Sequence, residues 1–154
     1  MERKGVKIST WFVTISTNIR PVDSSDAAAL SLDLELTVKE MFSTRHGLEY
    51  IMQFLEGSWN DIQHNADNEL TWGIEIGSDP RGGRVHAHVQ FKLYHTGKIH
   101  LDYKRIKQFV VEAMAPRCKG CHVDCHCVKG VDPVAGYILK GSTCDQLQGE
   151  TKVI

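Results

Sequence analysis

The sequence predicts an α+β fold, in which a central antiparallel β-sheet is flanked by helices. Two segments that alternate apolar and polar residues surround a turn-rich loop and predict a β-hairpin. Segments with apolar residues at helical spacing lie on either side of this hairpin, after residues that can cap a helix. A length of 154 residues is that of one domain.

The first strand is predicted over residues 8–17. Large apolar residues recur there at every second position from Trp11 to Ile15, which gives the strand one buried face. Residues 24–26, two serines and an aspartate, are candidate N-caps for a first helix. From there to Phe42 the pattern allows either one long helix or a short helix and a turn.

A second helix follows Ser43 or Thr44, either of which can cap it. Apolar residues recur at helical spacing over Leu48–Leu55, and Gly57 is the expected stop. Residues 59–68 are polar and predict a turn region.

The hairpin that follows is the most informative part of the sequence. Its strands, Trp72–Gly77 and Arg84–Phe91, are joined by the turn-forming residues Ser78–Gly83. In the second strand, apolar residues alternate with His86 and His88, so both imidazoles project from one side.

Glu75 lies on the polar side of the first hairpin strand, and antiparallel pairing would turn it toward His86 and His88. Two imidazoles and one carboxylate can bind a catalytic divalent metal and leave coordination positions open. Two nearby histidines also arise by chance in a chain with eight, so the histidines alone leave a structural role open. A carboxylate between apolar neighbours rarely lies mid-strand without a partner, which favours the metal site.

A further helix is predicted from Tyr103 to about Ala115, capped by Asp102 and ended by Pro116. Its apolar residues share one face. The basic residues between positions 104 and 107 lie mostly away from that face, and they are either solvated or in contact with phosphates.

Four cysteines lie close together in the last third of the chain and allow two interpretations. A Cys-x-x-Cys pair followed by further Cys and His is typical of structural zinc sites. Cys125 and Cys127 follow too closely to form the separate second pair that a tetrahedral site usually needs. The alternation over residues 122–127 instead favours a strand with small buried thiols. We therefore expect no bound zinc at Cys118, Cys121, Cys125 and Cys127.

A short helix of about two turns is predicted between Asp132, an N-cap, and Gly141, a C-terminal stop. Tyr137 and Lys140 are three residues apart and share one face of it. They are either surface residues of an amphipathic helix or a functional pair. Residues 142–154 are polar and predict a tail or the start of a linker.

Charge is distributed unevenly along the chain. Residues 1–70 hold 6 Lys and Arg against 11 Asp and Glu, whereas residues 71–154 hold 12 against 8. The basic half contains the candidate metal site, and a field of this sign suits a polyanion. No apolar run resembles a signal peptide or a membrane span, so we expect a cytoplasmic or nuclear protein that is not secreted. The odd number of five cysteines fits reduced thiols.

Three motifs occur in the order found in HUH endonucleases, specifically the single-tyrosine replication initiator (Rep) proteins of circular single-stranded DNA viruses and related replicons. Trp11–Ser16 resembles the first motif, His86–Val89 the histidine–hydrophobic–histidine motif, and Tyr137–Lys140 the motif of the nucleophilic tyrosine. Residues Cys121–Asp124 are similar to the strand that precedes this tyrosine. The resemblance covers residues 8–141.

The resemblance implies a fold akin to ferredoxin-like and RNA-recognition folds. It implies an endonuclease domain over residues 1–141 that binds and nicks a replication origin. It also implies that Glu75, His86 and His88 hold Mn²⁺ or Mg²⁺. The residues expected to contact DNA are Thr14, Ser16, Arg81, Arg84, Gln90 and Lys92.

The same resemblance implies that Tyr137 attacks the scissile phosphate, with Lys140 stabilising the phenolate or orienting the phosphate. The products would be a 5′-phosphotyrosine and a free 3′-hydroxyl that primes rolling-circle replication. The implied partners are single-stranded DNA at an origin stem-loop and a helicase domain in the full-length protein. The implied location is the host nucleus for a eukaryotic virus and otherwise the cytoplasm.

Two other function classes remain open. A sheet like that of RNA-recognition folds binds single-stranded nucleic acid by stacking and needs no catalysis. The cysteine stretch would instead fit a small zinc-dependent protein. Within the nuclease hypothesis, Tyr103 with Lys107 is a rival nucleophile pair, whereas Tyr94 is expected to be structural.

Overall fold

The computed structural model of the chain describes residues 6–64, 68–76, 83–100, 102–118, 120–127 and 147–153. Its elements are β1 (Lys7–Ser16), α1 (Ser24–Ser43), α2 (Arg45–Phe54), β2 (Glu69–Ile76), β3 (Val85–His95), α3 (Tyr103–Met114), β4 (His122–Cys127) and β5 (Leu147–Lys152). A short 3₁₀ helix, Trp59–Asp61, lies between α2 and β2.

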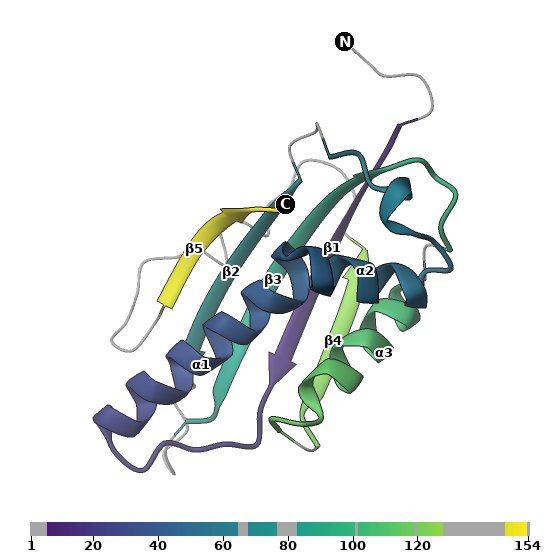
Figure 1. Ribbon diagram of the computed structural model, residues 1–154. Coiled ribbons are helices and arrows are strands. Elements are labelled where there is room, and N and C mark those ends of the chain that lie inside the picture. Colours follow the sequence, from purple (N-terminus) through teal and green to yellow (C-terminus); the bar gives the residue numbers. More distant parts are fainter. Residues whose placement is uncertain are drawn as a thin grey trace.

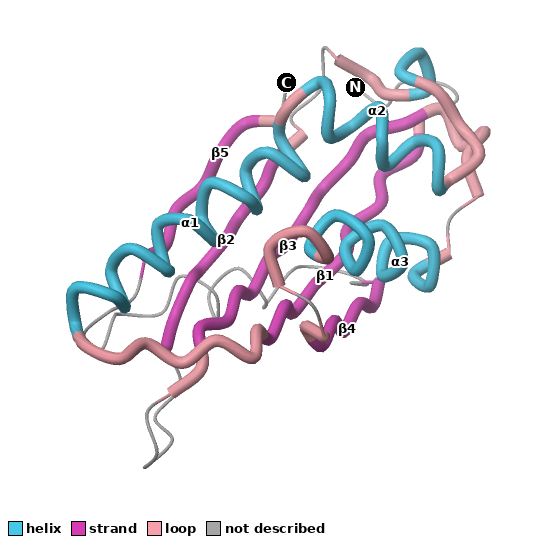
Figure 2. Tube along the Cα trace, turned by 60° about the horizontal axis from the view of Figure 1, so that its bottom comes forward, coloured by secondary structure: helices cyan, strands magenta, loops and turns pink. Residues whose placement is uncertain are grey.

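The strands form one antiparallel sheet in the order β4-β1-β3-β2-β5. The three α-helices of the described part lie on the same face, with α1 over β2 and β3 and α3 against β4 (Figure 1, Figure 2). Strands β1 to β4, with α1 and α3 in the crossovers, follow the β-α-β-β-α-β order of ferredoxin-like folds. The predicted α+β fold with a central antiparallel sheet is confirmed.

Side-chain caps set where the helices begin. The Asp23 carboxylate accepts a hydrogen bond from the backbone N–H of Asp26 at 2.8 Å, so α1 is capped one residue earlier than predicted. This helix continues without a break to Ser43, which settles the choice that the sequence left open. Thr44 caps α2 and Asp102 caps α3, as predicted.

The core lies between the sheet and the helices, and the alternating apolar residues of the strands build it. Trp11 and Ile15 of β1 and Phe91 of β3 are fully buried, and Trp11 stacks on Phe91 with ring centroids 5.7 Å apart. Phe42 of α1 contacts both Phe91 and Phe109 of α3. Because every second residue of β1 and β3 points into this core, the residues between them project from the other face.

The prediction that residues 142–154 form a tail is wrong for Leu147–Lys152, which pair with β2 as the edge strand β5. An edge strand takes its hydrogen bonds from the backbone of its neighbour, so it can form without an alternating apolar pattern. Gly149 lies against Trp72, and an added Cβ would approach the indole to 2.8 Å, so glycine suits this position. Val153 is buried beyond the strand.

Two predicted segments fall outside the described residues. These are the short helix between Asp132 and Gly141 and most of the hairpin loop, residues 77–82. In the part of the chain that is described, no helix combines the length and the apolar character needed to cross a membrane.

His95, the last residue of β3, lies in an environment that disfavours its charged form. Its side chain is fully buried, its Nε2 lies 2.8 Å from Ser9 Oγ, and its Nδ1 accepts from the Gly97 N–H at 3.0 Å. Burial lowers the pKa of His95 below the ordinary value of 6.5, and the positive charge of Lys7 adds to this shift, whereas Asp61 opposes it.

Below pH 6.5, the unfolded chain therefore binds a proton at His95 more readily than the folded chain does. We predict that the free energy of unfolding decreases as the pH falls from about 7 to about 5, and that His95→Gln makes this decrease smaller. Urea unfolding at a series of pH values measures the free energy of unfolding of each variant. The control is His100→Gln, at an exposed histidine, which should keep the pH dependence of the free energy of unfolding seen in wild type. An equal dependence in wild type and His95→Gln would contradict the prediction.

Candidate metal centre

The face of the sheet opposite the helices carries the residues that can perform chemistry. His86, His88, Gln90 and Lys92 of β3 alternate with buried apolar residues and project from this face, which we call the polar face. Antiparallel pairing of β2 with β3 places Glu75 directly beside His86. Residues far apart in the chain therefore meet on one surface.

Glu75, His86 and His88 form a compact cluster. Glu75 Oε1 lies 2.5 Å from His86 Nε2 and 3.3 Å from His88 Nε2. One ligand atom from each residue lies within 4.8 Å of the others. The three side chains are between 14% and 20% exposed, so the cluster is largely shielded but still reachable from solvent. Glu75 thus faces both histidines, as the hairpin pattern predicted.

These three side chains suit a divalent cation. Nitrogen and oxygen ligands bind first-row metals at about 2.0–2.2 Å, so ligands of one ion lie roughly 3–4 Å apart. The cluster already has nearly this spacing. Three protein ligands leave coordination positions for water or for an anionic oxygen of a substrate.

Strand β1 borders the cluster on the side away from Glu75. Ser16 pairs with His86, and Thr14 pairs with His88, with Thr14 Oγ1 3.3 Å from His88 Nδ1. Phe12, which sequence reasoning did not assign, stacks on the His88 ring with centroids 5.8 Å apart and an angle of 7° between the planes. The alternation of β1 indicates that these residues share a face, but only the register shows which histidine each one meets.

The other expected DNA-contact residues are spread along the polar face. Arg84 is exposed immediately before β3. Gln90 is buried, and its Oε1 has no hydrogen-bond partner in the described part of the structure. Lys92 is half-buried, with its Nζ 5.3 Å from the centre of the Tyr94 ring.

Tyr137, Lys140 and Arg81 lie outside the described residues, so their expected roles stay predictions. The rival nucleophile Tyr103 is the first residue of α3 and is exposed. Because α3 covers the opposite face (Figure 2), the sheet separates Tyr103 from His86.

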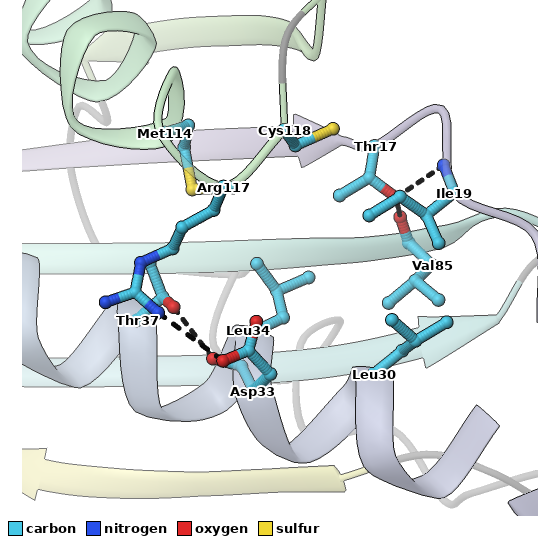
Figure 3. A pocket seen from close by; sticks show the side chains of 10 residues that line it. All are labelled: Thr17, Ile19, Leu30, Asp33, Leu34, Thr37, Val85, Met114, Arg117 and Cys118. Carbon is cyan, nitrogen blue, oxygen red and sulfur yellow. Dashed lines mark hydrogen bonds and ion pairs between the residues drawn. The ribbon is translucent and has the colours of Figure 1, made fainter. Parts of the chain in front are cut away.

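A small cavity between α1 and α3 is an alternative place for a ligand (Figure 3). Its volume of about 30 Å³ has room for only a few water molecules. Its two charged residues are already paired, with Arg117 Nη1 3.4 Å from Asp33 Oδ1. On the side nearer the sheet, the Thr17 hydroxyl donates to the Val85 carbonyl at 2.5 Å. The cavity is thus a packing feature of the helical layer rather than a substrate site.

The cysteine segment forms strand β4, as its alternation predicted. Cys118 and Cys125 are buried, and Cys118 Sγ donates a hydrogen bond to Asn18 Oδ1 at 3.0 Å. Burial raises the pKa of the Cys121 thiol, and the neighbouring Cys118 adds to the shift. This disfavours the thiolate that zinc requires. The side chain of Cys127 lies outside the described part.

No family model, curated protein or solved structure matches this chain. Within the described residues, Glu75, His86 and His88 are the one group of three or more His, Cys, Asp or Glu side chains close enough to share a metal ion. A functional conclusion therefore depends on this cluster and on the order of the sequence motifs.

We predict that His86→Ala and His88→Ala each weaken Mn²⁺ binding by more than about tenfold, because each removes one of three ligands. The fold should persist, since both side chains project from the polar face and not into the core. Electron paramagnetic resonance of free Mn²⁺ measures the affinity, and circular dichroism reports on the fold.

The matched control is His122→Ala. His122 also projects from the polar face but is exposed on the edge strand β4, so its removal should leave Mn²⁺ affinity unchanged. Wild-type affinity in His86→Ala or His88→Ala would contradict the metal centre. If Glu75→Ala alone kept full affinity, Gln90 or Asp79 would be the next candidate for the third ligand.

A second prediction concerns the cysteines. Protein purified without added metal should show no stoichiometric zinc in native mass spectrometry, because the thiols of Cys118 and Cys125 are buried in the core and Cys121 resists ionisation. A sample treated with a zinc chelator provides the reference mass. One tightly held zinc per chain in the untreated sample would refute this prediction.

Proposed function

We propose that this chain is a metal-dependent endonuclease for single-stranded DNA, of the HUH type that initiates rolling-circle replication. The observation that carries the proposal is the cluster of Glu75, His86 and His88 on the polar face. This cluster lies on adjacent inner strands of a β-α-β-β-α-β fold. A partly shielded cation site that stays open to an anionic oxygen suits phosphodiester chemistry.

Glu75, His86 and His88 would hold a cation against the scissile phosphate. A bound Mn²⁺ or Mg²⁺ would supply positive charge that polarises the scissile phosphate and offsets charge developing during attack. The carboxylate of Glu75 suits either ion, whereas the imidazoles of His86 and His88 favour Mn²⁺. Arg84 and Lys92, on or beside the same face, would hold neighbouring phosphates.

The positions of the tyrosines support Tyr137 as the nucleophile. The chain contains four tyrosines, and three of them are described. Tyr50 and Tyr103 lie on α2 and α3, in the helical layer that covers the face of the sheet opposite the polar face. Tyr94 lies six positions beyond His88 on β3, about 20 Å along the strand. We therefore propose Tyr137, outside the described residues, as the group that attacks.

In the proposed reaction, the phenolate oxygen of Tyr137 bonds to phosphorus and the bond from phosphorus to the 3′ oxygen breaks. The 3′ oxygen takes up a proton, and the 5′-phosphate stays on the tyrosine. A tyrosine phenol ordinarily has a pKa of about 10, so we propose that Lys140 stabilises the phenolate. Because one phosphodiester replaces another, the 3′-hydroxyl can reverse the reaction and rejoin the strand without ATP.

The proposed partners follow from this reaction. The substrate would be single-stranded DNA at the stem-loop of a replication origin, and the 3′-hydroxyl would prime synthesis. A helicase domain in the full-length protein would unwind the duplex ahead. The site of action would be the host nucleus for a replicon of a eukaryotic virus and the cytoplasm otherwise.

A second candidate function is binding of single-stranded nucleic acid without catalysis. Phe12 and Tyr94 are partly exposed rings on the polar face, and Lys92 lies close to Tyr94. Such surfaces bind bases by stacking and phosphates by charge. This function gives the Glu75 cluster no role, so metal-dependent cleavage distinguishes the two candidates.

We predict that wild-type protein, incubated with Mn²⁺ and a labelled pool of random single-stranded DNA, forms a covalent protein–DNA adduct that survives denaturing electrophoresis. Tyr137→Phe removes one oxygen, so DNA binding and the fold should persist, while adduct formation falls by at least about a thousandfold. Peptide mapping should place the nucleotide on Tyr137 through a 5′-phosphate.

Tyr103→Phe is the control and should form the adduct at the wild-type rate. An adduct on Tyr103 would contradict the assignment. Cleavage by Tyr137→Phe at the wild-type rate without an adduct would point to attack by metal-bound water. DNA binding by wild type with no cleavage in Mn²⁺ or Mg²⁺ would favour the second candidate function.

A further inference from the structure

Both imidazoles of the metal centre have a partner at Nδ1, the ring nitrogen that does not face Glu75. His86 Nδ1 lies 3.2 Å from the backbone carbonyl of Arg84, and His88 Nδ1 lies 3.3 Å from Thr14 Oγ1. Both Nε2 atoms are directed at the Glu75 carboxylate. A hydrogen bond at one ring nitrogen fixes the orientation and the tautomer that the other nitrogen offers to a metal.

The two partners differ in chemistry, because a carbonyl only accepts a hydrogen bond, whereas a hydroxyl both accepts and donates. Without a cation, the His88 Nε2–H can donate to Glu75 while Nδ1 accepts from the Thr14 hydroxyl. With a cation at Nε2, the ring proton lies on Nδ1 and can donate to Thr14 Oγ1. Thr14 can therefore keep its hydrogen bond in both states, which a purely apolar side chain of the same shape cannot do.

The position of Thr14 in the sheet holds this contact in place. Thr14 and His88 are register partners in the pairing of β1 with β3. The other side of β1 is buried in the core through Val13 and Ile15. Phe12 stacks on the His88 ring and restricts its tilt. The packed sheet therefore fixes the backbone positions from which the two side chains meet.

We infer that Thr14 is a positioning residue of the metal centre, which holds His88 with Nε2 turned toward Glu75 and so preorganises the ligands for a divalent cation. The inference rests on the metal centre of the proposed function. It gives the Thr14 hydroxyl a role different from the DNA contact expected from the sequence. Loss of such a supporting hydrogen bond lowers metal affinity by about 10- to 100-fold.

The test compares substitutions at Thr14 in the full chain, with Mn²⁺ alone as the probe. Thr14→Val replaces the hydroxyl by a methyl group and keeps the β-branched shape that suits a strand. The expected result is a Kd for Mn²⁺ about 10- to 100-fold above wild type, measured by electron paramagnetic resonance without DNA, at an unchanged Tm. Thr14→Ser restores the hydroxyl and should bring the Kd back to within about threefold of wild type.

Thr10→Val is the matched control. Thr10 lies on the same face of β1 but pairs with Lys92 instead of a histidine, so its substitution should leave the Kd unchanged. A folded Thr14→Val protein with wild-type affinity would overturn the inference, as would an equal loss in Thr10→Val or a Thr14→Ser protein no better than Thr14→Val. If Thr14→Val does not fold, Thr14→Ala takes its place in the same comparison with Thr14→Ser.

The outcomes also separate this inference from the proposed function. If wild type binds no Mn²⁺, the metal centre fails and the inference fails with it. If wild type binds Mn²⁺, and Thr14→Val loses affinity while Thr10→Val and Thr14→Ser keep it, the inference stands whether or not the protein cleaves DNA. Absence of cleavage in that case would count against the endonuclease only.

Discussion

The register between β2 and β3 is the constraint on which the candidate site depends. Pairing of Glu75 with His86 brings one carboxylate within reach of both imidazoles. Because successive residues of a strand point to opposite faces, a shift of one residue would turn Glu75 into the core and bring Ile74 or Ile76 to the polar face. That shift would bury a carboxylate and expose an apolar side chain, and both changes are unfavourable. The packed apolar face of the hairpin therefore determines the geometry of the polar face.

Strand β1 shows how the same constraint extends across the sheet. Its apolar residues lie under the helices, where Trp11 stacks on Phe91. Its other residues project from the polar face, where Thr14 and Phe12 contact His88. Packing on one side thus supports the orientation of His88 on the other. A cluster held in this way would lose little side-chain freedom on binding a cation, and such preorganisation favours tight and specific sites.

The starts of the helices were predictable to within about a residue, whereas contacts between distant segments were not. Thr44 and Asp102 were identified as caps because a capping side chain bonds a backbone N–H only two or three residues away. At α1 a run of Asp and Ser offers several such acceptors, and the structure uses Asp23. Strand β5 was not predicted, because it is held by hydrogen bonds to the backbone of β2 and not by an apolar pattern of its own. Gly149 suits this strand only because the Trp72 ring lies against it.

By itself, the sequence determined which residues of β1, β3 and β4 share a face, where the helices begin to within about a residue, and that Glu75, His86 and His88 belong to the polar side of one hairpin. These properties depend on alternation and capping, which act over a few neighbouring residues. Only the tertiary structure decided the strand order, the addition of β5, and the contact of Thr14 with His88 across 74 residues. Such contacts depend on the register that the whole core stabilises, so no single segment of the chain contains the information that fixes them.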